Sequence, residues 1–281
     1  MFCYQRSFGQ PTEVITKEQF RALITAPETI RKVKEAREAL AQGDKAGYDS
    51  KKKSLPFVIF IATYDESEKV FENKRTGEKT TRRGCWRSQQ HCRLNGLCVI
   101  DFDHVEGDVR KVWEEAYAKL SDEDKARILF VFVTPSGHGL KVVFMADAAI
   151  GNLIDNQIVF SKKLGLNPDE SCKDGSRGAF LTTEEDIILL DERIFDYENR
   201  EFGEKYNEAY HQGKSQGLTD REYDYAETVL HQFIKYSGRP VFAMETATVH
   251  PLQAFADLIT IEEYWRPLHS SPSIGGGRGK S

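Results

Sequence analysis

The sequence predicts an α+β fold organised around a split β-α-β-β-α-β sheet. Between residues 97 and 182, short apolar runs typical of strands alternate with segments whose apolar residues recur at helical spacing. The first of these strands ends in Asp101-Phe102-Asp103, and side-chain alternation places the two carboxylates on the same side of that strand. With 281 residues, of which 40% are hydrophobic and 30% charged, the chain is long enough to bury a sizeable core.

The N-terminal part is expected to be helical and to lead into a strand. Apolar residues recur at helical spacing from residue 17 to residue 42. Pro27 suits the first turn of a second helix and Gly43 suits its end. The near-continuous apolar run at 55–62 predicts a buried strand.

Six elements follow in the most regular part of the chain. We expect strands at 97–101, 128–133, 140–144 and 179–182, and helices at about 109–120 and 148–164. The turn at 134–139 joins the second and third strands, and a polar loop at 167–178 precedes the fourth. This order is that of the split βαβ, or ferredoxin-like (RRM-like), arrangement.

The order has a geometric consequence for the polar segments. The first crossover makes strands one and two parallel, the tight turn reverses strand three, and the second crossover makes strand four run with strand three. The end of strand one, the 134–139 turn and the loop before strand four are therefore expected at one edge of the sheet. Asp101 and Asp103, residues 136–139 and residues 174–177 would then converge there.

The C-terminal part predicts helices and a tail. Residues 186–204 are acidic, residues 219–236 have an amphipathic pattern, and 252–258 suggest a short helix. The glycine-rich end at 275–281 lacks the first glycine, the preceding strand and the following helix of a P-loop, and we expect a flexible tail. The expected organisation is an N-terminal helical segment (1–50), a core (51–200) and a helical C-terminal region (201–281).

Charge and cysteines exclude several classes of protein. A net charge of −5 gives no global attraction for nucleic acid, so any such surface must be local. Five scattered cysteines, without C-x₂-C spacing, favour reduced thiols over a disulfide framework or a zinc site. The first residues lack a signal-peptide pattern and no apolar run is long enough to span a bilayer, which predicts a cytoplasmic protein without a membrane partner.

A local basic segment precedes the Asp pair. From Lys69 to Arg93 there are eight basic residues, opposed by Glu72 and Glu78, with Trp86 interleaved. One interpretation is contact with nucleic-acid phosphates and bases, and the other is a solvated surface hairpin. The candidate nucleic-acid-binding residues are Arg75, Arg82, Arg83, Arg87 and Arg93.

Four motifs in this order carry a family resemblance: Lys53-Ser54-Leu55-Pro56, Asn95-Gly96-Leu97 before the Asp pair, Thr134-Pro135-Ser136-Gly137-His138-Gly139-Leu140-Lys141, and Cys172-Lys173-Asp174-Gly175-Ser176-Arg177 before Phe180-Leu181. Over about residues 50–200 the sequence resembles the BT4734-like (VirE N-terminal) domain of Bacteroidetes mobile elements. More distantly it is similar to the archaeo-eukaryotic primase (primase-polymerase) superfamily. It departs from the superfamily pattern where Lys173, and not an apolar residue, precedes Asp174.

The resemblance implies a metal-dependent nucleotidyltransferase of the primase or DNA polymerase type that acts in replication of a mobile genetic element. It implies catalytic residues Asp101, Asp103, His138 and Asp174, with Mg²⁺ or Mn²⁺ held by the three acids. It implies nucleotide binding by Ser136, Gly137, His138, Lys141 and Arg177. The implied partners are a single-stranded DNA template and nucleoside triphosphates, and a helicase in trans is left open.

Each assignment has an alternative. Asp101-Phe102-Asp103 alone also describes a solvated strand end, and His138 a tolerated turn residue. Lys141 also fits a strand position that faces solvent. Asp174 and Arg177 could instead form a surface ion pair with each other. Asp169 and Glu170 compete with Asp174 as the third acid.

One alternative function stays open, and a second is disfavoured by the order of the elements. The alternative function is a catalytically inactive nucleic-acid-binding relative of the same fold. A phosphotransferase with a nucleophilic Asp needs a doubly wound parallel sheet, which the element order argues against.

Overall fold

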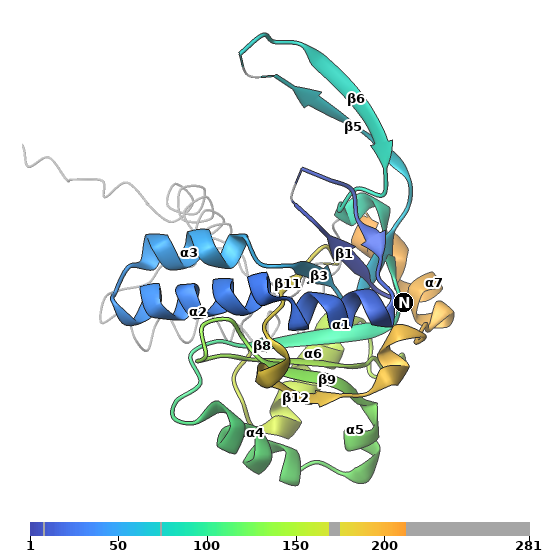
Figure 1. Ribbon diagram of the computed structural model, residues 1–281. Coiled ribbons are helices and arrows are strands. Elements are labelled where there is room, and N and C mark those ends of the chain that lie inside the picture. The colour runs from blue at the N-terminus through green and yellow to red at the C-terminus, as the bar shows by residue number, and fades with distance from the viewer. Residues whose placement is uncertain (8, 74, 169–174, 212–281) are drawn as a thin grey trace, which may run out of the picture. The chain divides into compact units, whose positions relative to one another are not determined.

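The computed structural model describes residues 1–7, 9–73, 75–168 and 175–211 (Figure 1). The chain divides into two compact units, Met1–Leu218 and Thr219–Ser281, and all described residues belong to the first. The helices expected at 219–236 and 252–258, and the tail, lie outside the described residues. The described part is a mixed α+β structure with antiparallel sheets, in agreement with the expected class.

Three helices follow the first two short strands of the chain: α1 (Lys17–Thr25), α2 (Pro27–Ala41) and α3 (Lys45–Lys53). Thr16 and the side chain at the third helical position form a reciprocal capping box at α1, and Pro27 starts α2 as expected. Gly43 ends this region with a positive φ of 76°. Helix α3 was not predicted, because its sequence is polar apart from Tyr48. The Asp44 cap and three C-terminal lysines favour it locally.

The central sheet has the order β12-β9-β10-β8. Its strands are β8 (Leu97–Phe102), β9 (Ile128–Val133), β10 (Leu140–Met145) and β12 (Ile187–Leu190). Strands β8 and β9 are both antiparallel to β10 and so run in the same direction, as the first crossover requires.

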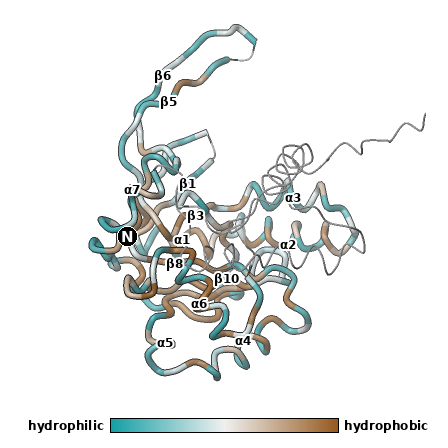
Figure 2. Tube along the Cα trace, turned by 180° about the vertical axis from the view of Figure 1, so that it is seen from behind, coloured by the Kyte–Doolittle hydropathy of each residue, from teal (hydrophilic) through white to brown (hydrophobic). Residues whose placement is uncertain are grey.

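Each face of this sheet is covered by a separate core. Hydrophobic residues are concentrated around the sheet, as the hydropathy colours show (Figure 2). On one face, Ile100, Phe102 and Val142 pack with α4 (Val109–Ala118) and α6 (Leu153–Leu164). On the other, Phe130 and Phe132 pack with α1, and the Phe20 ring meets Phe130 edge-on at 5.6 Å. Because residues alternate along β8, Asp101 points to the face opposite Ile100 and Phe102, the face covered by the N-terminal elements.

The predicted fourth strand is corrected by the structure. Strand β11 is only Ala179–Phe180, and it joins a second sheet, β11-β3-β1-β2, beside β3 (Phe57–Ile59). The other strands of that sheet are β1 (Cys3–Gln5) and β2 (Glu13–Val14). The Phe180 ring packs on Phe57 at 5.0 Å, which favours this edge. The strand beside β9 is instead the apolar β12. It lies within residues 186–204, a segment for which the sequence predicted acidic character but no strand.

The remaining elements connect or extend these layers. The predicted 55–62 strand is divided into β3 and β4 (Ala62–Tyr64), and β4 pairs with β7 (Cys92–Leu94). Strands β5 (Ser67–Glu72) and β6 (Lys79–Gly84) form a hairpin that projects from the sheets (Figure 1). The other elements are α5 (Asp122–Arg127), α7 (Arg200–His211) and short 3₁₀ helices at Gln89–His91, Glu184–Asp186 and Glu192–Phe195.

No helix within the described ranges has the length and apolar character needed to cross a membrane. The thiols of Cys3 and Cys98 are buried, and burial raises the pKa of Cys3 to about 11. These two thiols are therefore protonated at neutral pH.

Candidate functional site

A cavity of about 790 Å³ opens beside the ends of β8 and β10. Helices α2 and α3, strand β3, the 134–139 turn and residues 177–180 complete its walls. The sequence-predicted residues on these walls are Asp101, Asp103, Ser136, His138, Lys141, Arg177 and Arg87. The polar segments expected at one edge therefore line one cavity. The last of these segments contains Arg177 and leads into β11, which pairs with β3 in the second sheet. It does not lead into a fourth strand of the central sheet.

Lys141 and Asp101 are directly opposite each other on β10 and β8. Lys141 Nζ forms an ion pair with Asp101 Oδ2, and each side chain is 11% exposed. The alternative in which Lys141 faces solvent is therefore wrong. Opposite charges across an antiparallel pair are favourable, and here the pairing also offsets the cost of burying both groups.

Asp103 lies past the end of β8 and is exposed, while Phe102 between the two acids is buried. The chain then turns at His104, whose φ of 55° is the one positive value at a non-glycine residue among those described. The Val105 N–H donates to the His138 carbonyl at 2.8 Å. This bond holds the Asp103 loop against the 134–139 turn.

The 134–139 turn is closed by its own backbone. The Thr134 N–H donates to the Gly139 carbonyl, and the Gly137 N–H to the Thr134 carbonyl, both at 2.9 Å. Gly137 has a φ of 81°, which only glycine adopts at little cost. The Ser136 hydroxyl accepts from the His138 N–H at 3.2 Å and lies 3.0 Å from the Thr134 hydroxyl, and the His138 side chain is exposed.

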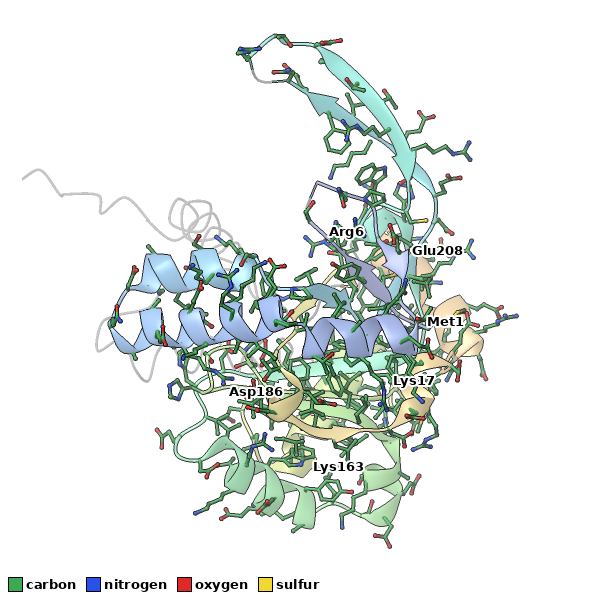
Figure 3. All side chains as sticks on the ribbon, in the orientation of Figure 1. Met1, Arg6, Lys17, Lys163, Asp186 and Glu208 are labelled. Atoms are coloured by element: carbon green, nitrogen blue, oxygen red, sulfur yellow. The ribbon has the colours of Figure 1, made fainter. Side chains whose placement is uncertain are left out.

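Helix α2 holds this turn from outside through Arg37, a residue that sequence reasoning missed. Arg37 Nε donates to the Pro135 carbonyl at 3.1 Å, and Nη2 lies 2.9 Å from Oδ1 of Asp186. Asp186 is labelled in Figure 3. Asp186 Oδ2 in turn accepts from Thr182 and Thr183. No sequence signal separates Arg37 from the other basic residues of α2.

Tyr48 of α3 is a second missed residue of the cavity wall. Burial raises the pKa of its hydroxyl, and a hydrogen bond with Ser136 opposes that shift. Tyr48 is the one aromatic residue in an otherwise polar helix, and this signal in the sequence could have identified it as a residue of the site.

The cavity is positively charged within an acidic protein. Five cationic side chains line it, against the two carboxylates of Asp101 and Asp103: Lys45, Lys52, Arg87, Lys141 and Arg177. Two of these cations lie over aromatic rings, with Lys52 Nζ 5.6 Å from the Tyr48 centroid and the Arg87 guanidinium 4.9 Å from that of Phe57. Such a concave basic surface attracts anionic groups.

Residues 77–188 match the family described as BT4734-like, N-terminal domain. This segment of the chain is similar to a BT4734-like N-terminal domain. The matched segment contains Asp101, Asp103, the 134–139 turn and Lys141, so the expected resemblance is confirmed for these residues.

Other comparisons cover little of the chain. It is 78% identical over 45 residues to N-succinylornithine carbamoyltransferase of Bacteroides thetaiotaomicron, and 73% identical over 45 residues to that of Bacteroides fragilis. Each match covers 16% of this chain and 14% of the relative, so the chain spans about a seventh of the length of these relatives. No solved structure matches the chain.

The basic residues between Lys69 and Arg93 lie in different surroundings in the structure. Arg87 lines the cavity, and Arg82 and Arg75 belong to the projecting hairpin and its turn. Arg83 pairs with Glu66 at 2.9 Å and Arg93 with Asp65 at 2.5 Å. Exposed pairs of this kind contribute little to stability, but they lower the positive charge that these two arginines present.

The two carboxylates of the cavity fit part of a metal site. Asp101 and Asp103 offer hard oxygen ligands, and Mg²⁺ commonly uses one or two carboxylates together with substrate phosphates. In the part of the chain that the structure describes, no three His, Cys, Asp or Glu side chains are arranged to hold a metal ion. Asp174, and its competitors Asp169 and Glu170, lie outside the described residues.

Proposed function

We propose that the protein is a metal-dependent nucleotidyltransferase of the primase or DNA polymerase type, which extends a nucleic-acid strand on a single-stranded DNA template during replication of a mobile genetic element. One observation carries the proposal: Asp101 and Asp103 line the same cavity as five cationic side chains. Transfer of a nucleotide needs carboxylates for the metal and cations for the triphosphate within one site.

The proposal gives each group a role. Asp101 and Asp103, with Asp174, would hold Mg²⁺ or Mn²⁺, which when bound neutralises phosphate charge and activates a 3′-hydroxyl. Lys52, Arg87 and Arg177 bind the phosphates of the incoming nucleotide. Ser136 and His138 of the 134–139 turn, which line the cavity, give these phosphates polar contacts. Gly137, which does not line the cavity, lets the turn adopt its backbone conformation.

A second candidate function is nucleic-acid binding without catalysis. The observation that favours it is the buried ion pair, because Lys141 already neutralises one of the carboxylates that a metal ion needs. In that case the cavity binds a phosphate group or a strand end through its cations alone.

Nucleotide incorporation separates the two candidates. The full chain is incubated with Mg²⁺ or Mn²⁺, labelled nucleotides and single-stranded template, with and without primer. Wild type is compared with Asp101→Ala/Asp103→Ala and with a control, Glu114→Ala/Glu115→Ala, which removes the same charge from exposed positions of α4.

The enzyme proposal expects incorporation by wild type and control and none by the Asp101→Ala/Asp103→Ala variant. Absence of incorporation with either metal, while single-stranded DNA is still bound, supports the second candidate. Equal incorporation by all three proteins shows that the site has been assigned to the wrong residues.

A further inference from the structure

The β5–β6 hairpin has two faces of different charge. Strand register pairs Lys69 with Arg82 and Phe71 with Thr80 on one side, which we call the Lys69 face. The opposite side, the Glu68 face, is made of Glu68, Val70, Glu72, Lys79, Thr81 and Arg83. Each side carries two basic residues, but only the Glu68 face also carries acids, so the net positive charge lies on the Lys69 face.

Charges on the Glu68 face are balanced. Glu68 lies directly opposite Arg83, whose guanidinium also pairs with Glu66 at 2.9 Å. Lys79 and Glu72 are partners in the ladder and their charged atoms are 4.0 Å apart. This side offers no excess of positive charge to a polyanion.

On the Lys69 face, two cations oppose each other across the strands with no acid on that side of β5 or β6. Both side chains are exposed, and neither forms an ion pair with any described residue. Like charges directly across an antiparallel pair are unfavourable. An anion bound between Lys69 and Arg82 would relieve that repulsion.

An aromatic platform holds these cations in place. The rings of Phe71 and Trp86 are 5.2 Å apart, and Lys69 Nζ lies 5.5 Å from the first centroid and 5.3 Å from the second. The Arg82 guanidinium lies 5.2 Å from the Phe71 ring, and the Trp86 indole donates to the Arg82 carbonyl at 3.2 Å. Cations restrained in this way lose less side-chain entropy when they bind a ligand.

The Lys69 face leads along the chain to the cavity. Strand β6 ends at Gly84, and the chain continues through Trp86 to Arg87, which lines the cavity wall. A cavity of about 790 Å³ has the size of a small-molecule site and does not admit a duplex. A strand that follows this route therefore enters the cavity single-stranded.

We propose that the Lys69 face binds the phosphate backbone of single-stranded nucleic acid. A membrane surface fits less well, because Trp86 is buried and Phe71 half-buried, while the exposed apolar Val70 lies on the opposite face. This inference rests on the proposed function only where it takes the bound strand to be the template that leads into the cavity. Binding is measured without nucleotides or metal, so either proposal can fail while the other holds.

The test measures fluorescence anisotropy of a labelled single-stranded oligonucleotide, and of its duplex, titrated with the full chain at several salt concentrations. Lys69→Gln/Arg82→Gln is compared with the matched control Lys79→Gln/Arg83→Gln, which removes the same charge from the other face of the same hairpin. A charge-preserving exchange, Lys69→Arg/Arg82→Lys, separates loss of charge from loss of folding.

We expect Lys69→Gln/Arg82→Gln to weaken single-strand binding about tenfold and to reduce the slope of log K against log salt by about 1.4, which is two phosphate contacts. The control and the charge-preserving exchange are expected to bind within about twofold of wild type. Equal weakening by both glutamine variants, no weakening by either, tighter binding of the duplex, or loss of binding in the charge-preserving exchange each overturns the proposal. Binding to phosphatidylserine vesicles that is lost through the same two residues, without binding of the oligonucleotide, also overturns it.

Discussion

Lys141 and Asp101 form a buried ion pair directly across strands β10 and β8, where the cavity opens beside the central sheet. The pair joins the first acid of the Asp-x-Asp motif to the last residue of the turn motif, forty positions later in the chain. Its neutrality lets two charged groups occupy a position where an isolated charge is strongly unfavourable.

We expect Lys141→Met to lower the free energy of unfolding by about 3–5 kcal/mol, because it leaves the Asp101 carboxylate buried without its counter-ion. The double variant Asp101→Asn/Lys141→Met is expected to lose less than Lys141→Met alone, since it removes both charges together. Urea denaturation of wild type, Lys141→Met, Asp101→Asn and the double variant measures the difference. A double variant as unstable as the sum of its single variants contradicts the pairing.

Removal of Arg37 tests the link between α2 and the turn. Arg37→Ala deletes the bonds to the Pro135 carbonyl and to Asp186, and we expect a loss of about 1–3 kcal/mol in the free energy of unfolding. The control is Lys34→Ala on the same helix, whose side chain is 77% exposed and lies 3.9 Å from Glu38. That control is expected to change stability by less than about 0.5 kcal/mol. Similar losses in both variants, read from thermal or urea unfolding, argue against a specific role of Arg37.

Gly139 is closely packed, and this packing predicts that substitutions of Gly139 and Thr134 have non-additive effects on the free energy of unfolding. A Cβ at this position would lie 2.6 Å from the Thr134 hydroxyl oxygen and 3.1 Å from the Phe102 carbonyl oxygen. We expect Gly139→Ala to destabilise the fold by about 1–3 kcal/mol. Because Thr134→Ala removes the nearer atom, it is expected to recover part of this loss in the double variant.

The control for that pair is Gly9→Ala, where a Cβ meets nothing within 4 Å. A loss in Gly9→Ala equal to that of Gly139→Ala, or strict additivity in the double-variant cycle, contradicts the packing argument.

The Asp124 carboxylate links stability to pH. Burial tends to raise the pKa of Asp124, but hydrogen bonds from Lys163 at 2.7 Å and from Ser121 at 2.8 Å, with the nearby positive charges, hold it below its usual value. As pH falls, the unfolded chain therefore binds the proton first, near pH 3.9, and the native state loses this contribution. Asp124→Asn is expected to be less stable than wild type by about 1–3 kcal/mol at neutral pH.

Urea unfolding of both proteins from about pH 7 to about pH 3 follows this difference. The difference is expected to narrow once the pH falls below the usual aspartate pKa. A difference that stays constant over the whole range means that the charge of Asp124 is not the cause.

The local features of this fold were predictable from the sequence because each depends on a few neighbouring residues. The 134–139 turn needs Gly137 at a positive φ, and the hairpin of β9 and β10 follows from that turn. The shared side of Asp101 and Asp103 follows from strand alternation. The match of residues 77–188 to the BT4734-like family agrees with motifs that were readable in the same way.

Only the tertiary structure decided which distant segments occupy the sheet edges and the cavity walls. Residues 179–180 pair with β3, and Ile187–Leu190 takes the place beside β9, since either apolar segment satisfies the alternation pattern and the choice depends on packing such as that of Phe180 on Phe57. The contact of Arg37 with the turn and the burial of Lys141 against Asp101 likewise join residues far apart in the chain. Periodicity and turn chemistry act over a few residues, whereas the partner of a buried charge or of an open strand edge is set by competition among all segments that the fold brings within reach.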